Sequence, residues 1–350
     1  MKNQRLYYLF IFFSTFSRNI IDIYSIIFLY QKFNNIKIIV LIYMFVYLFG
    51  SIISTMSLML GNKYGYKYLL IGSQIATVFA YYLNQHSNSV LLIASMLSLS
   101  IFMYHPIRHY YGLSLLKDKM MIGKSLIINY GGILLSQFFI IKKISIIYLI
   151  IISTIGIIPV MMMKKDNKKV IKYPHIKELG RKKILFFIFD QTKIIFLLFE
   201  PLYLYLISKN IGYIGIFNIV LTVSSIIYVY VIAYKINIEK KYKIINILFT
   251  LVLLLKLGIS NKCLLLIIAF LEGIGVKTNE LISTMNLYNY QSKESFTGYL
   301  IVSEIIFCLV RCLILLILYL SNISLKIFMY ILIVGILLLS FMYQKRDNSS

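Results

Sequence analysis

Long apolar runs, each followed by a short polar segment, recur along the whole chain. A helix of about 20 apolar residues can cross the ~30 Å hydrocarbon core of a membrane. A transmembrane β-barrel would instead need short segments of alternating hydrophobicity, which the sequence lacks. The pattern therefore predicts an all-α polytopic membrane protein with twelve transmembrane helices. The predicted spans are residues 6–30, 36–59, 68–84, 90–107, 120–140, 144–163, 184–207, 211–233, 243–259, 263–283, 298–320 and 324–343.

Composition agrees with a membrane protein. Hydrophobic residues make up 60% of the chain and charged residues only 14%, whereas a soluble globular protein has ~45–50% and ~25%. The formal net charge of +24 would indicate nucleic acid in a soluble domain. Here the Lys and Arg residues lie mostly between spans, so we expect them to set topology and expect no nucleic-acid partner.

A basic segment, residues 164–183, lies near the middle of the chain and contains only Asp166 and Glu178 as acidic residues. Such segments stay on the cytoplasmic side of a membrane. We therefore expect an N-terminal six-helix bundle over 1–163, a cytoplasmic linker over 164–183 and a C-terminal six-helix bundle over 184–350. Both termini are then cytoplasmic, and the Ile-, Lys- and Asn-rich usage favours a bacterial plasma membrane. In this topology eight basic residues face the exterior of the cell: Lys32, Lys37, Lys142, Lys143, Lys209, Lys256, Lys262 and Lys326.

The two halves show weak internal similarity at a shift of 175 residues. Each half has six predicted spans, so both halves begin on the same side of the membrane. This favours two parallel repeats related by an axis along the membrane normal. The matched pairs are Arg18 with Lys193, Tyr30 with Tyr205, Asn35 with Asn210, and Gly123 with Gly298.

The segment Leu60-Gly61-Asn62-Lys63-Tyr64-Gly65-Tyr66-Lys67 lies between the second and third spans. It resembles the cytoplasmic signature loop of the major facilitator superfamily, commonly written G-x-L-a-D-R-x-G-R-R/K. Lys63, Gly65 and Lys67 match, whereas Asn62 replaces the usual Asp and Leu58 stands at the leading Gly. The resemblance implies a gating loop at Asn62, Lys63, Gly65 and Lys67; the alternative is an ordinary basic turn, in which Gly65 permits a positive φ.

Membership of this superfamily would imply a monomeric transporter of two six-helix bundles that works by alternating access. The fifth span keeps Gly131 and Gly132 but lacks the proline of the drug/proton antiporter motif. The missing proline weakens the case for antiport, so the resemblance bears on the architecture more than on the mode of transport.

Ionisable residues inside the spans are the candidate site residues, because each costs roughly 2.5–3.5 kcal/mol at the membrane centre unless it faces a cavity or a partner. Arg18 and Asp22 are one helical turn apart, so they could neutralise each other or point together into a cavity. Asp190 and Lys193 have a similar spacing in the seventh span. The superfamily resemblance implies that Arg18 and Lys193 face each other across a substrate path.

Three further carboxylates and one arginine complete the candidate set. Glu304 and Arg311 are two turns apart, which favours partners on other helices. Glu200 and Glu272 have no basic residue within one turn, and desolvation favours the protonated form of an unpaired carboxylate. Such a group suits proton coupling, and Glu272 lies ~15 Å into its span. A packing role is the alternative for each.

These features together predict a secondary active transporter that exports a small amphipathic compound or peptide-like product by proton-coupled alternating access. The crowding of Tyr and Phe in four spans suits such a solute. The alternatives are a lipid or polysaccharide flippase, a solute uptake facilitator, and a sensor protein that has kept a transporter fold. The short outer loops argue against an enzyme. Protons and membrane lipids are the other expected partners.

No cofactor or metal is expected. The chain has no phosphate-binding G-x-x-x-x-G-K-[ST] loop, and its four histidines form no ligand pattern. His105 and His109 are instead expected in a cytoplasmic loop near the lipid headgroups.

Overall fold

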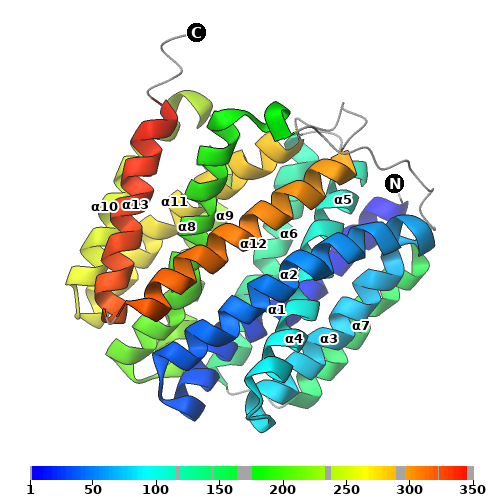
Figure 1. The fold of residues 1–350 in the computed structure, drawn as a ribbon, viewed down its shortest axis with the longest axis horizontal. Coiled ribbons are helices and arrows are strands. Elements are labelled where there is room, and N and C mark those ends of the chain that lie inside the picture. The colour runs from blue at the N-terminus through cyan, green and yellow to red at the C-terminus, as the bar shows by residue number, and fades with distance from the viewer. Residues whose placement is uncertain are drawn as a thin grey trace. The chain divides into compact units, whose positions relative to one another are not determined.

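The protein is described by a computed structural model that covers residues 2–115, 119–142, 146–163, 176–232, 238–288, 296–321 and 323–344. Over these residues every regular element is a helix (Figure 1). The helices are α1 (Lys2–Phe33), α2 (Ile36–Tyr64), α3 (Tyr66–His86), α4 (Val90–Phe102), α5 (His105–Leu115), α6 (Lys119–Ile141), α7 (Ile146–Met162), α8 (Ile176–Ser208), α9 (Ile211–Ile227), the π-helical turn η1 (Tyr228–Ile232), α10 (Ile238–Gly258), α11 (Lys262–Tyr288), α12 (Phe296–Leu320) and α13 (Leu325–Gln344).

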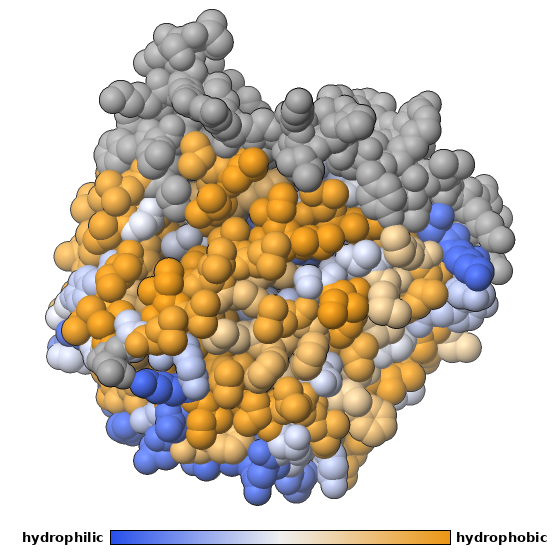
Figure 2. All heavy atoms as spheres, viewed as in Figure 1, coloured by the Kyte–Doolittle hydropathy of each residue, from blue (hydrophilic) through white to orange (hydrophobic). Residues whose placement is uncertain are grey.

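Each predicted span falls on one of these helices or on a helix pair, so the helical class is confirmed. Among the described residues, six helices are long and apolar enough to cross a membrane, and three more are shorter apolar helices. The outward side chains are themselves apolar: Ile317 is 63% exposed and Leu320 is 70% exposed. Figure 2 shows hydrophobic side chains over most of the visible surface. A soluble protein rarely exposes so much contiguous apolar surface, so the protein is membrane-embedded.

The described helices form two compact units by their contacts. The first contains residues 1–174 together with 293–320, and the second contains 175–292 together with 321–350. Helix α12 belongs to the predicted C-terminal bundle over 184–350, but it packs against α2 in the first unit. Of the basic linker predicted at 164–183, residues 164–175 lie outside the described part of the chain and the rest form the start of α8.

Helix α1 lies at the centre of the first unit. It contacts α2, α3, α6 and α7. In its most apolar stretch 78% of the residues are buried, against 39–50% in the other five long apolar helices described. A helix enclosed in this way can carry polar side chains away from lipid. The position of α1 therefore explains how Arg18 and several Ser and Thr residues are accommodated in a long apolar helix.

The second unit repeats contacts of the first. The pairs α1–α2, α1–α7, α2–α4, α3–α4 and α3–α7 correspond under the sequence repeat to α8–α9, α8–α13, α9–α11, α10–α11 and α10–α13, and all of these contacts occur. The α1–α6 and α1–α3 contacts have no comparable counterparts in α8–α12 and α8–α10 among the described helices, so the repeat in packing covers these five helix pairs only.

The helix connections at equivalent positions also share their backbone geometry. Asn34 has a φ of 46° and Lys209, 175 residues later, a φ of 52°. Their amides donate to Tyr30 O and Tyr205 O, both at 2.8 Å. The next residue in each half, Asn35 or Asn210, then caps the following helix by accepting a hydrogen bond from the backbone amide two residues on. The weak sequence match at a shift of 175 therefore corresponds to one turn used twice.

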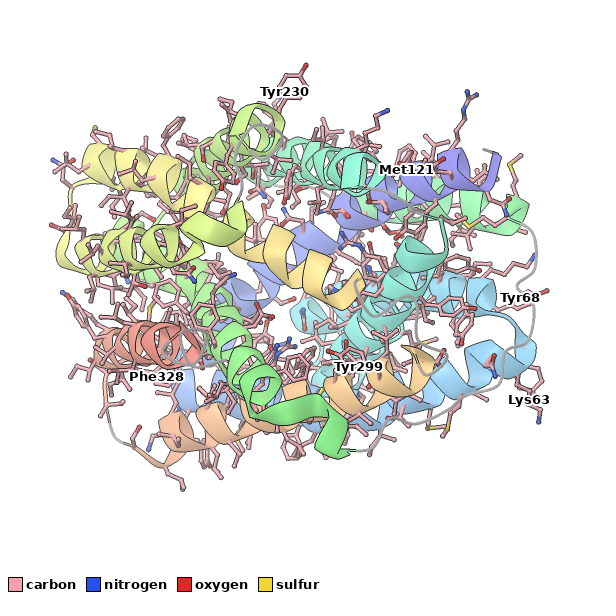
Figure 3. All side chains as sticks on the ribbon, turned by 90° about the horizontal axis from the view of Figure 1, so that it is seen from above. Lys63, Tyr68, Met121, Tyr230, Tyr299 and Phe328 are labelled. Atoms are coloured by element: carbon pink, nitrogen blue, oxygen red, sulfur yellow. The ribbon has the colours of Figure 1, made fainter. Side chains whose placement is uncertain are left out.

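The turn between α2 and α3 confirms the conformation predicted for Gly65, whose φ is 111°. Lys63 is exposed and extends away from the end of α2 (Figure 3). Its Nζ lies 5.2 Å from the centre of the Tyr64 ring, and Lys67 Nζ lies 5.4 Å from that of Tyr68. Asn62 is half-buried in the last turn of α2. The gating role of these residues stays a prediction.

The histidine-containing segment is a helix, not the predicted loop. His105 begins α5, and Pro106 occupies its first turn, where a missing amide hydrogen breaks no helical hydrogen bond. The break between α4 and α5 is limited to Met103 and Tyr104. The loop was predicted because a proline often ends a helix. A proline can also occupy the first turn of a new helix, and the sequence alone does not distinguish the two cases.

Candidate sites of buried charge

Two carboxylates enclose one lysine inside the second unit. Lys256 extends from α10, Glu272 from α11 and Glu200 from α8. Lys256 Nζ lies 2.7 Å from Glu272 Oε2 and also forms an ion pair with Glu200 Oε1. Lys256 and Glu272 are fully buried, and Glu200 is 6% exposed. We call these three residues the buried triad.

Aromatic rings and a backbone contact surround the ammonium of this triad. Lys256 Nζ lies 5.0 Å from the centre of the Phe217 ring and 5.5 Å from that of Phe196. Both distances are within the range of a cation–π interaction. The hydroxyl of Tyr203 donates to Leu257 O at 3.1 Å, which fixes α8 against the end of α10. The lysine is thus held where water does not compete with its two carboxylate partners.

The triad has one more potential negative charge than positive charge. Glu272 Oε1 and Glu200 Oε1 accept no hydrogen bond within the described residues, although Glu200 is in ion-pair contact with Lys256. Two buried carboxylates beside one ammonium leave a net charge that costs several kcal/mol to keep away from water. The triad is therefore most stable when it also holds one proton, or another cation.

This arrangement corrects two expectations from the sequence. Glu200 and Glu272 are not unpaired, and Lys256 does not lie in an outer loop. Sixteen residues separate Lys256 from Glu272, so a search within one helical turn could not find the pair. The available signal was Lys256 itself, because it interrupts the apolar run Leu251–Leu257 just before the end of α10.

Gly273, next to Glu272, lets α11 approach α9 closely. A Cβ at this position would lie 2.3 Å from Leu221 O and 2.0 Å from Ser224 Oγ. Ser225 Oγ also donates to Gly273 O at 3.1 Å. The backbone contact means that no side-chain rotation alone can make room for a methyl group.

We expect Gly273→Ala to lower the thermal stability of the purified protein, although alanine is the better helix former by about 1 kcal/mol. Overpacking at such a contact typically costs about 1–3 kcal/mol. The control is Gly258→Ala at the end of α10, where an added Cβ has no neighbour within 4 Å. Equal melting temperatures for the two variants, measured in the same detergent, would contradict the close approach.

In the first unit, Arg18 is buried at 6% exposure among α1, α4 and Tyr104. Its Nη1 donates to Ser100 O and lies 3.3 Å from Ser100 Oγ. Ser100 Oγ in turn lies 2.8 Å from Thr77 Oγ1 on α3. The guanidinium stacks over the Tyr104 ring, with 3.9 Å between Cζ and the ring centre. Arg18 Nε and Nη2 have no hydrogen-bond partner among the described residues.

Asp22 does not pair with Arg18, contrary to the first of the two expectations for this spacing. No ion pair joins them, and Asp22 is exposed while the residues on either side of it are buried. The second expectation, that both side chains point into a shared cavity, stays a prediction.

Arg311 contacts an aromatic ring on another helix, in agreement with the partner on a different helix that its spacing from Glu304 predicted. Its Cζ lies 5.0 Å from the centre of the Tyr47 ring on α2, and α12 and α2 pack together in the first unit. Glu304 is 7% exposed. No ion pair joins Glu304 to Arg311 among the described residues.

Asp190 and Lys193 lie on α8 in the second unit. Asp190 is half-buried and accepts a hydrogen bond from Gln191 Nε2 at 3.3 Å, whereas Lys193 is buried at 4% exposure. Arg18 belongs to the first unit and Lys193 to the second. The predicted apposition of Arg18 and Lys193 across a substrate path stays a prediction.

The described helices and their buried ionisable residues define the class: an α-helical membrane protein with charged groups enclosed inside its helical units. Among the described residues no three His, Cys, Asp or Glu side chains gather as metal ligands. Comparison of the chain with protein-family models and with curated proteins found no match.

Proposed function

We propose that the protein is a secondary transporter that exports a small amphipathic compound or a peptide-like product in exchange for protons. Twelve membrane-crossing helices, with both termini in the cytoplasm of a bacterial cell, would carry out alternating access. The single observation that supports this proposal best is the buried triad, because intramembrane ionisable residues are expensive and typically mark ion or substrate pathways.

The excess carboxylate of the triad gives it the property that coupling requires. A site with two acids and one lysine can exchange one proton without leaving the lysine unpaired. In the protonated state the buried charges balance, and in the deprotonated state they do not. A change in solvent access would therefore favour loading the proton on one side of the membrane and releasing it on the other.

The repeated turn and the repeated helix contacts support a duplicated architecture of the kind seen in the major facilitator superfamily. The loop around Gly65 has the positive φ that a tight connection there needs. Both observations lie within single units of the protein. They favour a carrier with two related halves over a flippase without this symmetry.

The proposal predicts pH-driven solute movement in proteoliposomes. Vesicles with an acidic lumen should accumulate a member of a panel of organic cations and short hydrophobic peptides, and collapse of the gradient with a protonophore should abolish the accumulation. The single substitutions Arg18→Gln, Asp22→Asn and Glu272→Gln should each reduce the flux at least about tenfold, as expected for loss of one strong charged interaction. Lys262→Met, at the exposed start of α11, serves as the control.

Unchanged flux in all three variants, at equal amounts of folded protein, would refute the assignment of these residues. Accumulation that depends on the solute gradient alone would support a facilitator instead. The assay therefore separates the residues, the coupling and the direction from one another.

A further inference from the structure

We infer that Arg18 binds a carboxylate group of the transported compound through Nε and Nη2. The inference deepens the proposed function and rests on it, because it names the chemical class of the substrate. It starts from the arrangement of donors around one buried guanidinium in the first unit.

A guanidinium has five N–H donors in a fixed plane and accepts no hydrogen bonds. In Arg18 one side of the plane is used, because Nη1 donates to Ser100 O. The opposite edge, formed by Nε and Nη2, has no hydrogen-bond partner in the described part of the chain, although both atoms are buried. Buried polar groups are nearly always hydrogen-bonded, so an edge left open requires an explanation.

The open edge has the geometry of a carboxylate receptor. Two parallel N–H groups of an arginine match the two oxygens of a carboxylate, and this bidentate contact is stronger and more selective than a single hydrogen bond. Nε and Nη2 are such a pair. A neutral amide or alcohol could accept from only one of them with good geometry.

The guanidinium is also held in place before any ligand binds. Its face lies against the Tyr104 ring at 3.9 Å. The Tyr104 hydroxyl lies 3.0 Å from Ser14 Oγ on α1, and the Tyr104 ring packs against Phe10 with 5.9 Å between ring centres. A donor group that is already ordered loses little entropy on binding.

The surrounding charges permit an anion at this edge. Arg108 lies near the same aromatic ring, with 5.9 Å between its Cζ and the centre of the Tyr104 ring, so two cations flank Tyr104. Asp22 opposes an anion through space, but it does not occupy the edge of Arg18.

The test compares carboxylic acids with their neutral amides. The purified protein in phosphatidylcholine nanodiscs would be titrated with acetate, benzoate, N-acetyl-phenylalanine and N-acetyl-phenylalanyl-leucine, and with the amide of each. We expect at least one acid to bind about 10- to 100-fold more tightly than its amide, the range for a hydrogen-bonded charge pair. If no acid is preferred over its amide, the inference is overturned.

Two substitutions at Arg18 and one matched control locate the preference. Arg18→Gln should abolish it, and Arg18→Lys, which keeps the charge without the paired N–H groups, should reduce it. Arg5→Gln on the same helix should leave it intact, because Arg5 is exposed. Gel filtration and melting temperature verify the fold of each variant. A preference that survives both Arg18 substitutions would place the anion elsewhere and overturn the inference.

Two further arms separate the possible failures. Added phosphatidylglycerol should not compete with the acid; competition would identify a lipid phosphate as the occupant and overturn the inference. A preference for acids in the absence of any flux would support the Arg18 site and contradict the transporter. A pH-driven flux without preference for acids would support the transporter and contradict the Arg18 site.

Discussion

The substitution Lys256→Met is expected to destabilise the protein by about 3–5 kcal/mol, the cost of removing one partner from a buried ion pair. The reason is that Glu200 and Glu272 would remain buried without a cation. Methionine has nearly the same length and no charge, so lost packing contributes little. The free energy of unfolding can be measured by titrating the purified protein in mixed micelles with a denaturing detergent.

A rescue variant separates the charge from the shape of the triad. Combining Lys256→Met with Glu200→Gln and Glu272→Gln removes every formal charge. Because no uncompensated charge is then buried, the triple variant should be more stable than Lys256→Met alone. The matched control is Lys262→Met, which changes an exposed lysine six residues later. Equal stability of the Lys256→Met and Lys262→Met proteins would show that the triad is not formed.

Removing one carboxylate of the triad is expected to uncouple transport from protons. In a Glu272→Gln protein, Lys256 and Glu200 form a balanced pair and no extra proton is needed to neutralise them. Accumulation driven by a pH gradient should then fall to the level seen without a gradient, while exchange of labelled for unlabelled solute continues. Glu200→Gln should act in the same way, because either carboxylate can be the one in excess.

The control for this prediction is Glu178→Gln, since Glu178 lies in the basic segment before the apolar part of α8. Its substitution should leave both accumulation and exchange unchanged. Loss of exchange together with accumulation in the Glu272→Gln protein would indicate a structural role for the triad. Retained gradient-driven accumulation in both Glu variants would mean that another group carries the proton.

Gly273 and Glu272 are neighbours on α11, but they stabilise the protein through different forces. Gly273→Ala acts through a steric contact with α9, whereas Glu272→Gln acts through charge in contact with α8 and α10. If both variants lost stability to the same extent, a general weakness of α11 would explain the result. Loss of stability in Gly273→Ala alone and loss of proton coupling in Glu272→Gln alone would show that helix packing and charge act separately here.

The sequence by itself indicated where most of the helices lie and that the turn after the first helix recurs 175 residues later. Both are local properties. An apolar run of sufficient length forms a helix in a membrane whatever lies beside it. The turn at Asn34 and Asn35 is also local, because a left-handed residue followed by an asparagine cap depends only on neighbouring residues. The positive φ of Gly65 follows from the same kind of information.

Only the tertiary structure decided which charges meet. Lys256 is joined to Glu200 and Glu272 from three different helices, and Arg18 turns toward Ser100 on α4 and not toward Asp22 on its own helix. Spacing along one helix gives the face on which a side chain lies, but not what the neighbouring helix presents there. The grouping of α12 with the first unit was likewise decided by packing. The energy of a buried charge depends on its nearest partner in space, and that partner is set by how helices pack, which no single helix encodes.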